Sequence, residues 1–273
     1  MSFFNIRGIT APDRKQCIED TTIPLLVDYI GFQETKKENF TNSFLKNVLG
    51  NRDFNWKHLP AIGTAGGILV GISNDVFEVI NWEVKKFTVS TVAKIRSCGT
   101  VIRLTTVYGS PYEEGKQLFI SELHELFLNW DGPAIIGGDI NLVRCQADKS
   151  NGVVDFKWVD KFNAWIDMWA LIEIGLAGRN FTWSNNQVDA IRSRIDRIFC
   201  NTSFDALFPL AHARALPRLG SDHTPILWDS GAGQIPKKSR FKYEKWWSAR
   251  PDFIDIVTKS WSTNCSSDNV VDI

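Results

Sequence analysis

Long apolar segments are absent from this sequence of 273 residues. Nothing in it approaches the run of about 18 apolar residues that a membrane-spanning helix needs. The residues after Met1 also lack the basic segment and apolar stretch of a secretory signal. We therefore expect a soluble protein that has no membrane partner.

Cysteine is sparse, and its spacing suggests no pairs. The chain has five cysteines, an odd number, and no two of them form a Cys-x-x-Cys pair: Cys17, Cys98, Cys145, Cys200 and Cys265. This spacing argues against a disulfide framework and against a structural zinc site. We expect reduced, partly buried thiols and hence an intracellular protein.

Net charge is also absent, because 31 basic residues balance 31 acidic ones. Proteins that hold nucleic acid by electrostatic attraction alone are usually basic. The balance therefore argues against tight, purely electrostatic DNA binding, but it is compatible with an enzyme that neutralises one phosphate with a metal ion. A hydrophobic content of 44% is enough for one large domain with a substantial core.

Short apolar segments rich in β-branched and aromatic residues are what the sequence does contain. They predict strands at 2–6, 28–33, 67–73, 77–82, 88–95, 101–108 and 134–138. Apolar residues at helical spacing predict helices at 114–129 and 160–172. Several strands follow one another without a helix between them, which favours mixed or antiparallel sheets in an α/β or α+β fold.

The composition changes after the apolar run that ends at Trp228. A turn-rich stretch (229–233) and a basic one (236–240) lead into an aromatic segment (241–250). We therefore predict one domain over residues 1–232 and a linker-like, partly helical extension over residues 233–273.

Polar residues of catalytic type follow two of the predicted strands. Glu34 comes directly after strand 28–33, where a carboxylate is well placed to bind a hard cation, although acids are also favoured at the start of a helix. In Gly137–Asn141, Asp139 and Asn141 alternate along an extended chain and so point the same way. That pair suits a metal-bound phosphate and an attacking water; the alternative is a turn after a core strand.

His223 is the one of the four histidines that lies in a polar, glycine-edged context, next to Asp222. Imidazole titrates near neutral pH and therefore suits general base catalysis, although a loop histidine can also simply cap local backbone. A catalytic imidazole needs a carboxylate that fixes its tautomer. Asp196, in the alternating segment 192–198, is a candidate, and an exposed salt-bridged strand is the alternative.

The order of these motifs resembles that of the endonuclease/exonuclease/phosphatase superfamily, the DNase I-like fold that includes apurinic/apyrimidinic endonucleases. The motifs that carry the resemblance are FNIRGI (4–9), GFQETK (31–36), TAGGILV (64–70), TTVYGSP (105–111), GGDIN (137–141), FTWSN (181–185), SRIDRIF (193–199) and SDHTPI (221–226). Each is weak alone, but together they span roughly residues 3–228 in a specific order. Within the superfamily the chain looks most like the endonuclease domain of plant LINE-type non-LTR retrotransposons.

The segment RFKYEKWW (240–247) resembles the one that follows this domain in such elements, where a reverse transcriptase comes next. This chain ends at Ile273 without one, so we expect a fragment or a stand-alone remnant.

The resemblance implies a DNase I-like four-layer sandwich, in which two mixed β-sheets pack face to face between flanking helices. It also implies a Mg²⁺ ion, which Mn²⁺ can replace, bound directly by Glu34 with Asn5 and Asp222 nearby. A divalent cation would neutralise an anionic phosphodiester and stabilise the leaving oxygen.

The same resemblance implies roles for the other polar residues. Asp139 would orient or activate the attacking water, and Asn141 would hold a phosphate oxygen. His223, paired with Asp196, would contact the scissile phosphate or act as the base, and Tyr108 would donate a hydrogen bond to the phosphate. Which of Asp139 and His223 deprotonates the water stays open.

Thr182 and Ser193 match positions that contact the DNA backbone in the superfamily. Three positions depart from its pattern. Arg7 stands where many relatives carry an acid or asparagine, and Phe4 stands where tryptophan is usual. The segment 108–111 lacks the asparagine that normally follows its proline.

These motifs predict a Mg²⁺-dependent phosphodiesterase that nicks target DNA, with no obligate protein partner. Two alternatives are a phosphoesterase acting on RNA or a phosphoinositide, and a catalytically idle remnant that only binds nucleic acid. A nuclear location follows only from a DNA substrate. Removing residues 233–273 is expected to leave activity intact.

Overall fold

The computed structural model describes residues 1–231, apart from 22, 51, 64, 129 and 219, together with residues 252–262. The chain divides into two compact units, Met1–Ala232 and Gly233–Ile273. In the second unit, α6 (Phe253–Ser262) is a described helix. The basic and aromatic segments at 236–250 lie outside the described residues, and the predicted role of this region as a linker stays a prediction.

The first unit alternates short strands with a few helices. In chain order its elements are β1 (Ser2–Asn5), α1 (Pro12–Thr21), β2 (Tyr29–Gln33), α2 (Asn42–Val48), β3 (Phe54–Leu59), β4 (Ile68–Ser73), β5 (Phe77–Val84), β6 (Thr88–Ile95), β7 (Val101–Tyr108), α3 (Glu113–Leu128), β8 (Ala134–Asp139), η1 (Gln146–Asp148), α4 (Phe156–Met168), β9 (Ile172–Glu173), β10 (Leu176–Ala177), β11 (Trp183–Ser184), β12 (Arg192–Ser193), β13 (Asp196–Cys200), α5 (Thr202–Leu207), β14 (His212–Ala215) and β15 (Ile226–Asp229).

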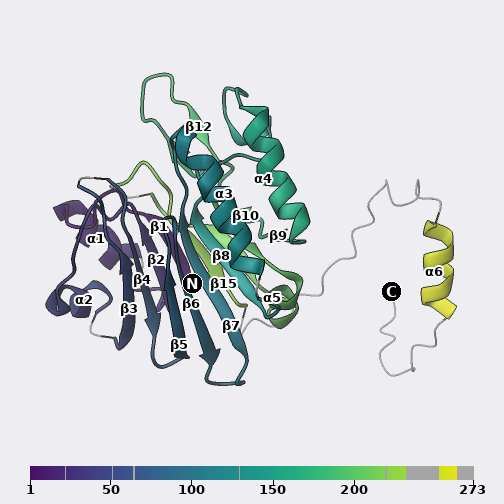
Figure 1. Ribbon diagram of the computed structural model, residues 1–273, viewed down its shortest axis with the longest axis horizontal. Helices are drawn as coiled ribbons and strands as arrows, with labels where there is room; N and C mark the ends of the chain where they lie inside the picture. The colour runs from purple at the N-terminus through teal and green to yellow at the C-terminus, as the bar shows by residue number, and fades with distance from the viewer. Residues whose placement is uncertain are drawn as a thin grey trace. The chain divides into compact units, whose positions relative to one another are not determined.

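Within the described residues, two large mixed sheets account for most of these strands. A seven-stranded sheet has the order β10-β14-β15-β1-β2-β4-β3, and a six-stranded sheet has the order β5-β6-β7-β8-β13-β9. Each sheet contains parallel and antiparallel pairs: β1 runs parallel to β2, and β7 runs parallel to β8. Figure 1 shows the strands β5 to β8 lying side by side. The predicted mixed sheets are confirmed.

The two sheets pack face to face through an apolar core. Phe3 and Tyr29 from one sheet join Val89, Leu104 and Ile135 from the other in one cluster of buried side chains. Burying such side chains stabilises the fold by roughly 1.5–3 kcal/mol each.

Glycine sets how closely the sheets approach at two points. A Cβ on Gly31 would lie 2.1 Å from Thr106 Oγ1, and a Cβ on Gly137 would lie 2.5 Å from the Phe3 ring. Any larger side chain at these positions would therefore push the two sheets apart.

Helices cover the outer face of each sheet. Helices α3 and α4 lie over the six-stranded sheet (Figure 1). Their buried side chains, among them Phe119 and Trp165, share an apolar cluster with residues of β7, β8 and β13. On the other side α1 and α2 contribute Ile18 and Val48 to a cluster that includes Phe4 and Phe32. Helix, sheet, sheet and helix form the predicted four-layer sandwich, so the fold prediction is confirmed.

Most predicted strands agree with the structure within one or two residues, but one predicted helix is displaced. Helix α4 begins at Phe156 instead of 160, because the Asp155 side chain caps it by accepting a hydrogen bond from the Lys157 N–H. It ends at Met168, before the predicted end at 172. The elements that had no counterpart in the prediction are α1, α2, β3, η1, β9, β10, β11, α5 and β14.

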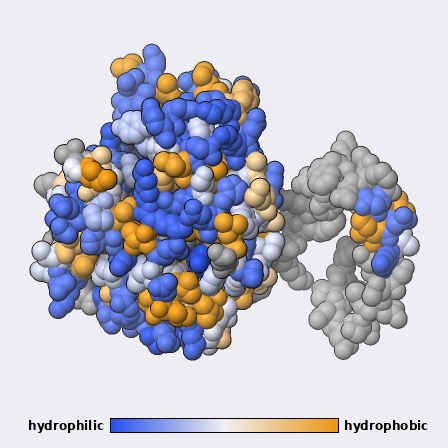
Figure 2. Space-filling view, viewed as in Figure 1, coloured by the Kyte–Doolittle hydropathy of each residue, from blue (hydrophilic) through white to orange (hydrophobic). Residues whose placement is uncertain are grey.

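No helix in the described part of the chain combines the length and the apolar character needed to cross a bilayer. Figure 2 shows a largely hydrophilic face of the first unit, on which hydrophobic residues form small groups.

Candidate active site

Strand register places several predicted residues at one edge of the sandwich. In the six-stranded sheet, Asp139 at the end of β8 pairs with Tyr108 on the parallel neighbour β7 and with Asp196 on the antiparallel neighbour β13. In the other sheet, Asn5 at the end of β1 pairs with Gln33 at the end of β2. Contact between the two sheets then brings these strand ends together, since the Asn5 side-chain amide donates a 2.8 Å hydrogen bond to Asp139.

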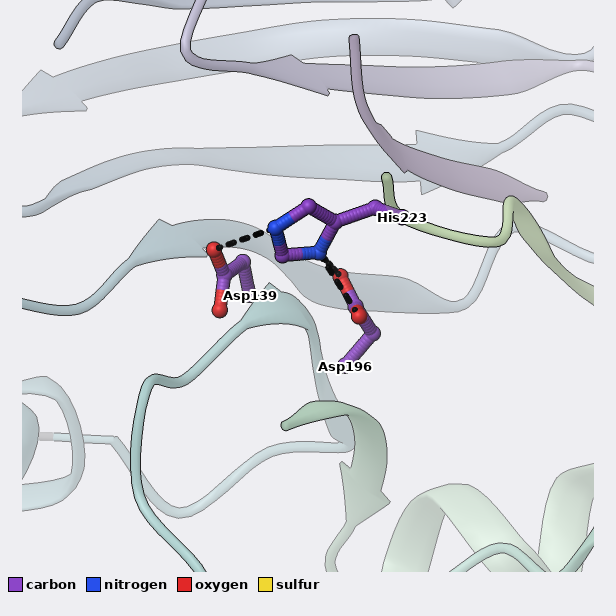
Figure 3. A group of neighbouring side chains, drawn as sticks. All are labelled: Asp139, Asp196 and His223. Atoms are coloured by element: carbon purple, nitrogen blue, oxygen red, sulfur yellow. Dashed lines mark hydrogen bonds and ion pairs between the residues drawn. The ribbon is translucent and has the colours of Figure 1, made fainter. Parts of the chain in front are cut away.

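His223 lies between two buried carboxyl groups (Figure 3). Its Nδ1 is 3.0 Å and 3.1 Å from the two Asp196 carboxylate oxygens, and its Nε2 is 3.8 Å from Asp139 Oδ2. The backbone N–H of His223 donates to Ser221 Oγ, which itself donates to the carbonyl of Asn5. The imidazole is therefore fixed at both its backbone and its ring.

The pKa values of His223 and Asp139 are both raised, for different reasons. Burial lowers the pKa of His223, but the carboxylates of Asp196, Asp139 and Asp222 outweigh it and raise the pKa to about 9. Burial raises the pKa of Asp139 to about 7, and Asp196 adds to that rise, while His223 and the Asn5 hydrogen bond oppose it. His223 and Asp139 therefore both hold their protons to a higher pH than the same side chains do when exposed to solvent.

Backbone conformation aims two further residues at the site. Glu34 and Asn141 follow β2 and β8 with φ of 51° and 55°, in the left-handed region that non-glycine residues seldom adopt. The Asn141 N–H donates to Asp139 Oδ1, and its side-chain amide donates to the carbonyl of Gly109. Strain of this kind concentrates at functional sites, where surrounding structure holds it in place.

All of these strand ends open into one pocket of about 720 Å³. The predicted residues that line it are Asn5, Glu34, Tyr108, Asp139, Asn141, Ser193, Asp222 and His223. Burial and the charges of Glu34 and Asp139 raise the pKa of Tyr108, so its hydroxyl stays a hydrogen-bond donor. The structure thus brings together residues that lie more than 200 positions apart in the sequence.

Two sets of side chains have the chemistry to bind a cation. Asp139, Asp196 and His223 offer ligand atoms within 4.8 Å of one another. In that set, however, the ring of His223 is already engaged by the two carboxylates, and a metal would have to break those contacts.

Glu34, Asn5 and Asp222 form the second set, and all three line the pocket. Asp222 Oδ1 is buried and has no hydrogen-bond partner among the described residues, which suits an absent cation. Carboxylate and carboxamide oxygens are good ligands for hard divalent cations, so these residues fit the divalent metal that the family generally uses.

Thr182 does not line the pocket but supports a residue of the site from the protein interior. Its side chain is fully buried, and its hydroxyl accepts hydrogen bonds from the N–H groups of Ile195 and Asp196 at 3.1 and 3.0 Å. Its geometry makes it a positioning residue for Asp196, whereas Ser193 lines the pocket. Contact of either residue with a nucleic-acid backbone stays a prediction.

Three functional positions had no assigned role in the sequence. Trp183 lines the pocket and donates from its indole Nε1 to Asp222 Oδ2 at 2.9 Å. Ser221 holds the His223 backbone, and Arg7 pairs with Asp222 and lies 3.9 Å from Glu34. Each stands inside a motif that carried the resemblance, which was the available signal, but spacing alone does not show which side chains meet.

The mixed two-sheet sandwich and the buried carboxyl–imidazole group are consistent with a hydrolytic family that acts on phosphoester bonds. The chain belongs to the endonuclease/exonuclease/phosphatase family, whose sequence model matches residues 3–223. No curated protein matches the chain.

Solved structures with this fold include several nucleases. A 3'-5' exonuclease (NExo) from Neisseria meningitidis is 16% identical over 84% of this chain and 98% of its own, with a TM-score of 0.61. An AP endonuclease from Archaeoglobus fulgidus is 16% identical over 84% and 97%, with a TM-score of 0.62. The endonuclease domain of TRAS1, a telomere-specific non-LTR retrotransposon, is 15% identical over 82% and 94%, with a TM-score of 0.60. At such identities the likeness concerns the fold alone.

Proposed function

We propose that this protein is a Mg²⁺-dependent endonuclease that hydrolyses phosphodiester bonds in DNA, in the manner of the endonucleases of non-LTR retroelements. The observation that carries the proposal is the buried Asp139–His223–Asp196 group, of which Asp139 and His223 line a pocket that Glu34 and Asp222 also line. A charged phosphodiester needs both cationic stabilisation and an activated water, and these two sets of side chains would supply them.

Glu34, with Asn5 and Asp222 nearby, would hold the cation. When bound, Mg²⁺ supplies positive charge that neutralises the phosphodiester and stabilises the leaving oxygen. Burial of the Asp222 carboxylate and the left-handed backbone at Glu34 hold these ligands in place before the metal arrives.

Asp139 is the better candidate for the base, and His223 for the electrophile. The pKa of Asp139, raised to about 7, suits proton abstraction near neutral pH. The raised pKa of His223 keeps its Nε2 protonated, so the ring can donate a hydrogen bond to the non-bridging oxygens as charge develops on them. Asp196 accepts from Nδ1 and keeps the ring pointed at the pocket.

Tyr108 and Asn141 complete the recognition of the phosphate. Both line the pocket. Both also carry hydrogen-bond donors, a hydroxyl and an amide, that stay uncharged at physiological pH. Neutral donors aimed at a developing anion stabilise the transition state without the desolvation cost of a further charge.

A plasmid assay tests the proposal. The wild-type protein is expected to convert supercoiled DNA to nicked circles when Mg²⁺ is present and to fail when EDTA removes it. Glu34→Gln and His223→Gln should each lower the rate roughly 100-fold or more, because each removes a group that stabilises the transition state. Glu78→Gln on β5 and His212→Gln on β14 change the same residue types away from the pocket and should leave the rate unchanged.

The outcome separates the proposal from its alternatives. No nicking by a folded wild-type protein would exclude DNA endonuclease activity and direct the search to RNA and phosphoinositide substrates. Nicking that survives both pocket variants would show that the activity comes from another site or a contaminant.

A further inference from the structure

Arg7 occupies the space between the two carboxylates that the proposed metal site needs. Its guanidinium pairs with Asp222 Oδ2, and its Nε lies 3.9 Å from Glu34 Oε1. Both carboxylates face the pocket that also holds Asp139 and His223. A guanidinium in this position supplies the positive charge that a divalent cation would otherwise supply.

The backbone at Arg7 is fixed, so only its side chain is free to move. The Arg7 N–H donates to Asn5 Oδ1 at 3.2 Å, and the Gly8 N–H donates to the carbonyl of Glu34 at 2.7 Å. Arg7 and Gly8 form a left-handed turn with φ of 52° and 101°. The side chain itself is half exposed, so the guanidinium can leave the carboxylates for solvent without moving the turn.

Arg7 and a divalent cation would compete for the two carboxylates, although Asp222 Oδ1 has no partner of its own among the described residues. Asp222 Oδ2 already accepts from Trp183 as well as pairing with Arg7, and Glu34 Oε1 also pairs with Lys36 at 3.0 Å. A divalent ion bound to Glu34 and Asp222 would lie within a few ångströms of the guanidinium, where like charges repel strongly.

We propose that Arg7 is a built-in competitor of the divalent cation, which must displace it from Glu34 and Asp222 before the site is loaded. The proposal rests on the proposed metal-dependent function and adds to it a residue that sets the metal affinity. Without metal, Arg7 keeps the two carboxylates from repelling each other. With metal, the freed guanidinium remains at the mouth of a pocket built for a phosphate.

Metal titration tests this competition without reference to activity. Mn²⁺ binding is measured by isothermal titration calorimetry on metal-free wild type, Arg7→Gln and Arg52→Gln. Arg52 forms a comparable ion pair with Asp28 at 2.9 Å but does not line the pocket, so it is the matched control. Arg7→Gln should bind Mn²⁺ roughly three- to tenfold more tightly than wild type, the scale of one partly exposed ion pair, and Arg52→Gln should match wild type.

A second variant covers the case in which Arg7→Gln does not fold, which thermal melting in EDTA reveals. Arg7→Lys keeps the charge but loses the planar fork that spans both carboxylates, so its Mn²⁺ affinity should also exceed that of wild type, by a smaller factor. An unchanged or weaker affinity in the folded variants would overturn the proposal, and so would the absence of Mn²⁺ binding in every protein.

The nicking assay separates this proposal from the proposed function. Metal-dependent nicking together with an unchanged Mn²⁺ affinity in Arg7→Gln would overturn the Arg7 proposal and support the proposed endonuclease activity. Tighter Mn²⁺ binding in Arg7→Gln together with no hydrolysis of DNA would support the Arg7 proposal and overturn the endonuclease activity.

Discussion

Asp139 shows how one residue can be tuned for chemistry at the expense of stability. Its carboxyl group is fully buried beside Asp196, and only His223, Asn5 and the Asn141 N–H favour its ionised form. A folded-state pKa near 7 means that the folded protein holds this proton more tightly than the unfolded chain does. The stability that the protonated carboxyl contributes is present below about pH 4 and is lost as pH rises towards 7.

Replacing Asp139 by asparagine should therefore change stability in a pH-dependent way. In EDTA, the free energy of unfolding of Asp139→Asn relative to wild type should move in favour of the variant between pH 4.5 and pH 7, by on the order of 2 kcal/mol. Urea unfolding at several pH values measures it. Asp75→Asn, at an exposed carboxylate, is the control and should show no such trend; a flat difference for Asp139→Asn would contradict the raised pKa.

Among the elements, the short hairpin of β11 and β12 is connected to β13 by hydrogen bonds of Thr182, the residue just before β11. Its hydroxyl accepts hydrogen bonds from two buried N–H groups, those of Ile195 and Asp196, and so fixes the backbone position from which the Asp196 side chain extends. The hairpin also carries Trp183, which bonds to Asp222, and a backbone bridge to His223. This short hairpin and the adjacent Thr182 thus contact Asp196, Asp222 and His223.

Thr182→Val should lower both stability and activity, because it leaves two buried N–H groups without an acceptor. We expect a loss of about 2–4 kcal/mol in the free energy of unfolding and a reduced nicking rate at saturating DNA. Thr182→Ser keeps the hydroxyl and should restore most of both. If the serine variant were as damaged as the valine one, the methyl packing, and not the hydrogen bonds, would be what positions Asp196.

The elements also show where sequence reasoning succeeds and where it stops. Segments such as 68–73 and 101–108 are rich in β-branched residues and were predicted as strands, whereas α1 (Pro12–Thr21) has few apolar residues and gave no helical pattern. Motif order predicted a set of site residues, most of which line one pocket in the structure, and their roles stay predictions. It could not predict the burial of Thr182 or the ion pairs of Arg7, because both depend on how the strands meet in three dimensions.

At the scale of the whole molecule, the predicted domain boundary follows the last strand. β15 lies between β1 and β14 in the seven-stranded sheet and ends at Asp229, and the last residue of the pocket is His223. The chain through residue 232 therefore contains both sheets and every proposed catalytic group.

A protein that stops at residue 232 should fold and nick plasmid DNA at close to the full-length rate. Thermal melting and the nicking assay test it together. A protein that stops at residue 224 loses β15, which pairs with both β1 and β14, and should not fold. Loss of folding in the longer truncation would place the domain boundary further towards the C-terminus.

The pairing of Asp139 with Tyr108 on one side and Asp196 on the other has a consequence for where the chain can change length. Losing one residue within β8 would turn the side chains beyond the deletion, Asp139 among them, to the opposite face of the sheet, and because β8 is buried along its whole length the core would be disrupted as well. Losing one residue at the tip of the β11–β12 hairpin, where Val188 is fully exposed, should leave the two large sheets unchanged. Natural variation in the length of this chain should therefore collect at that hairpin tip and be absent from β8.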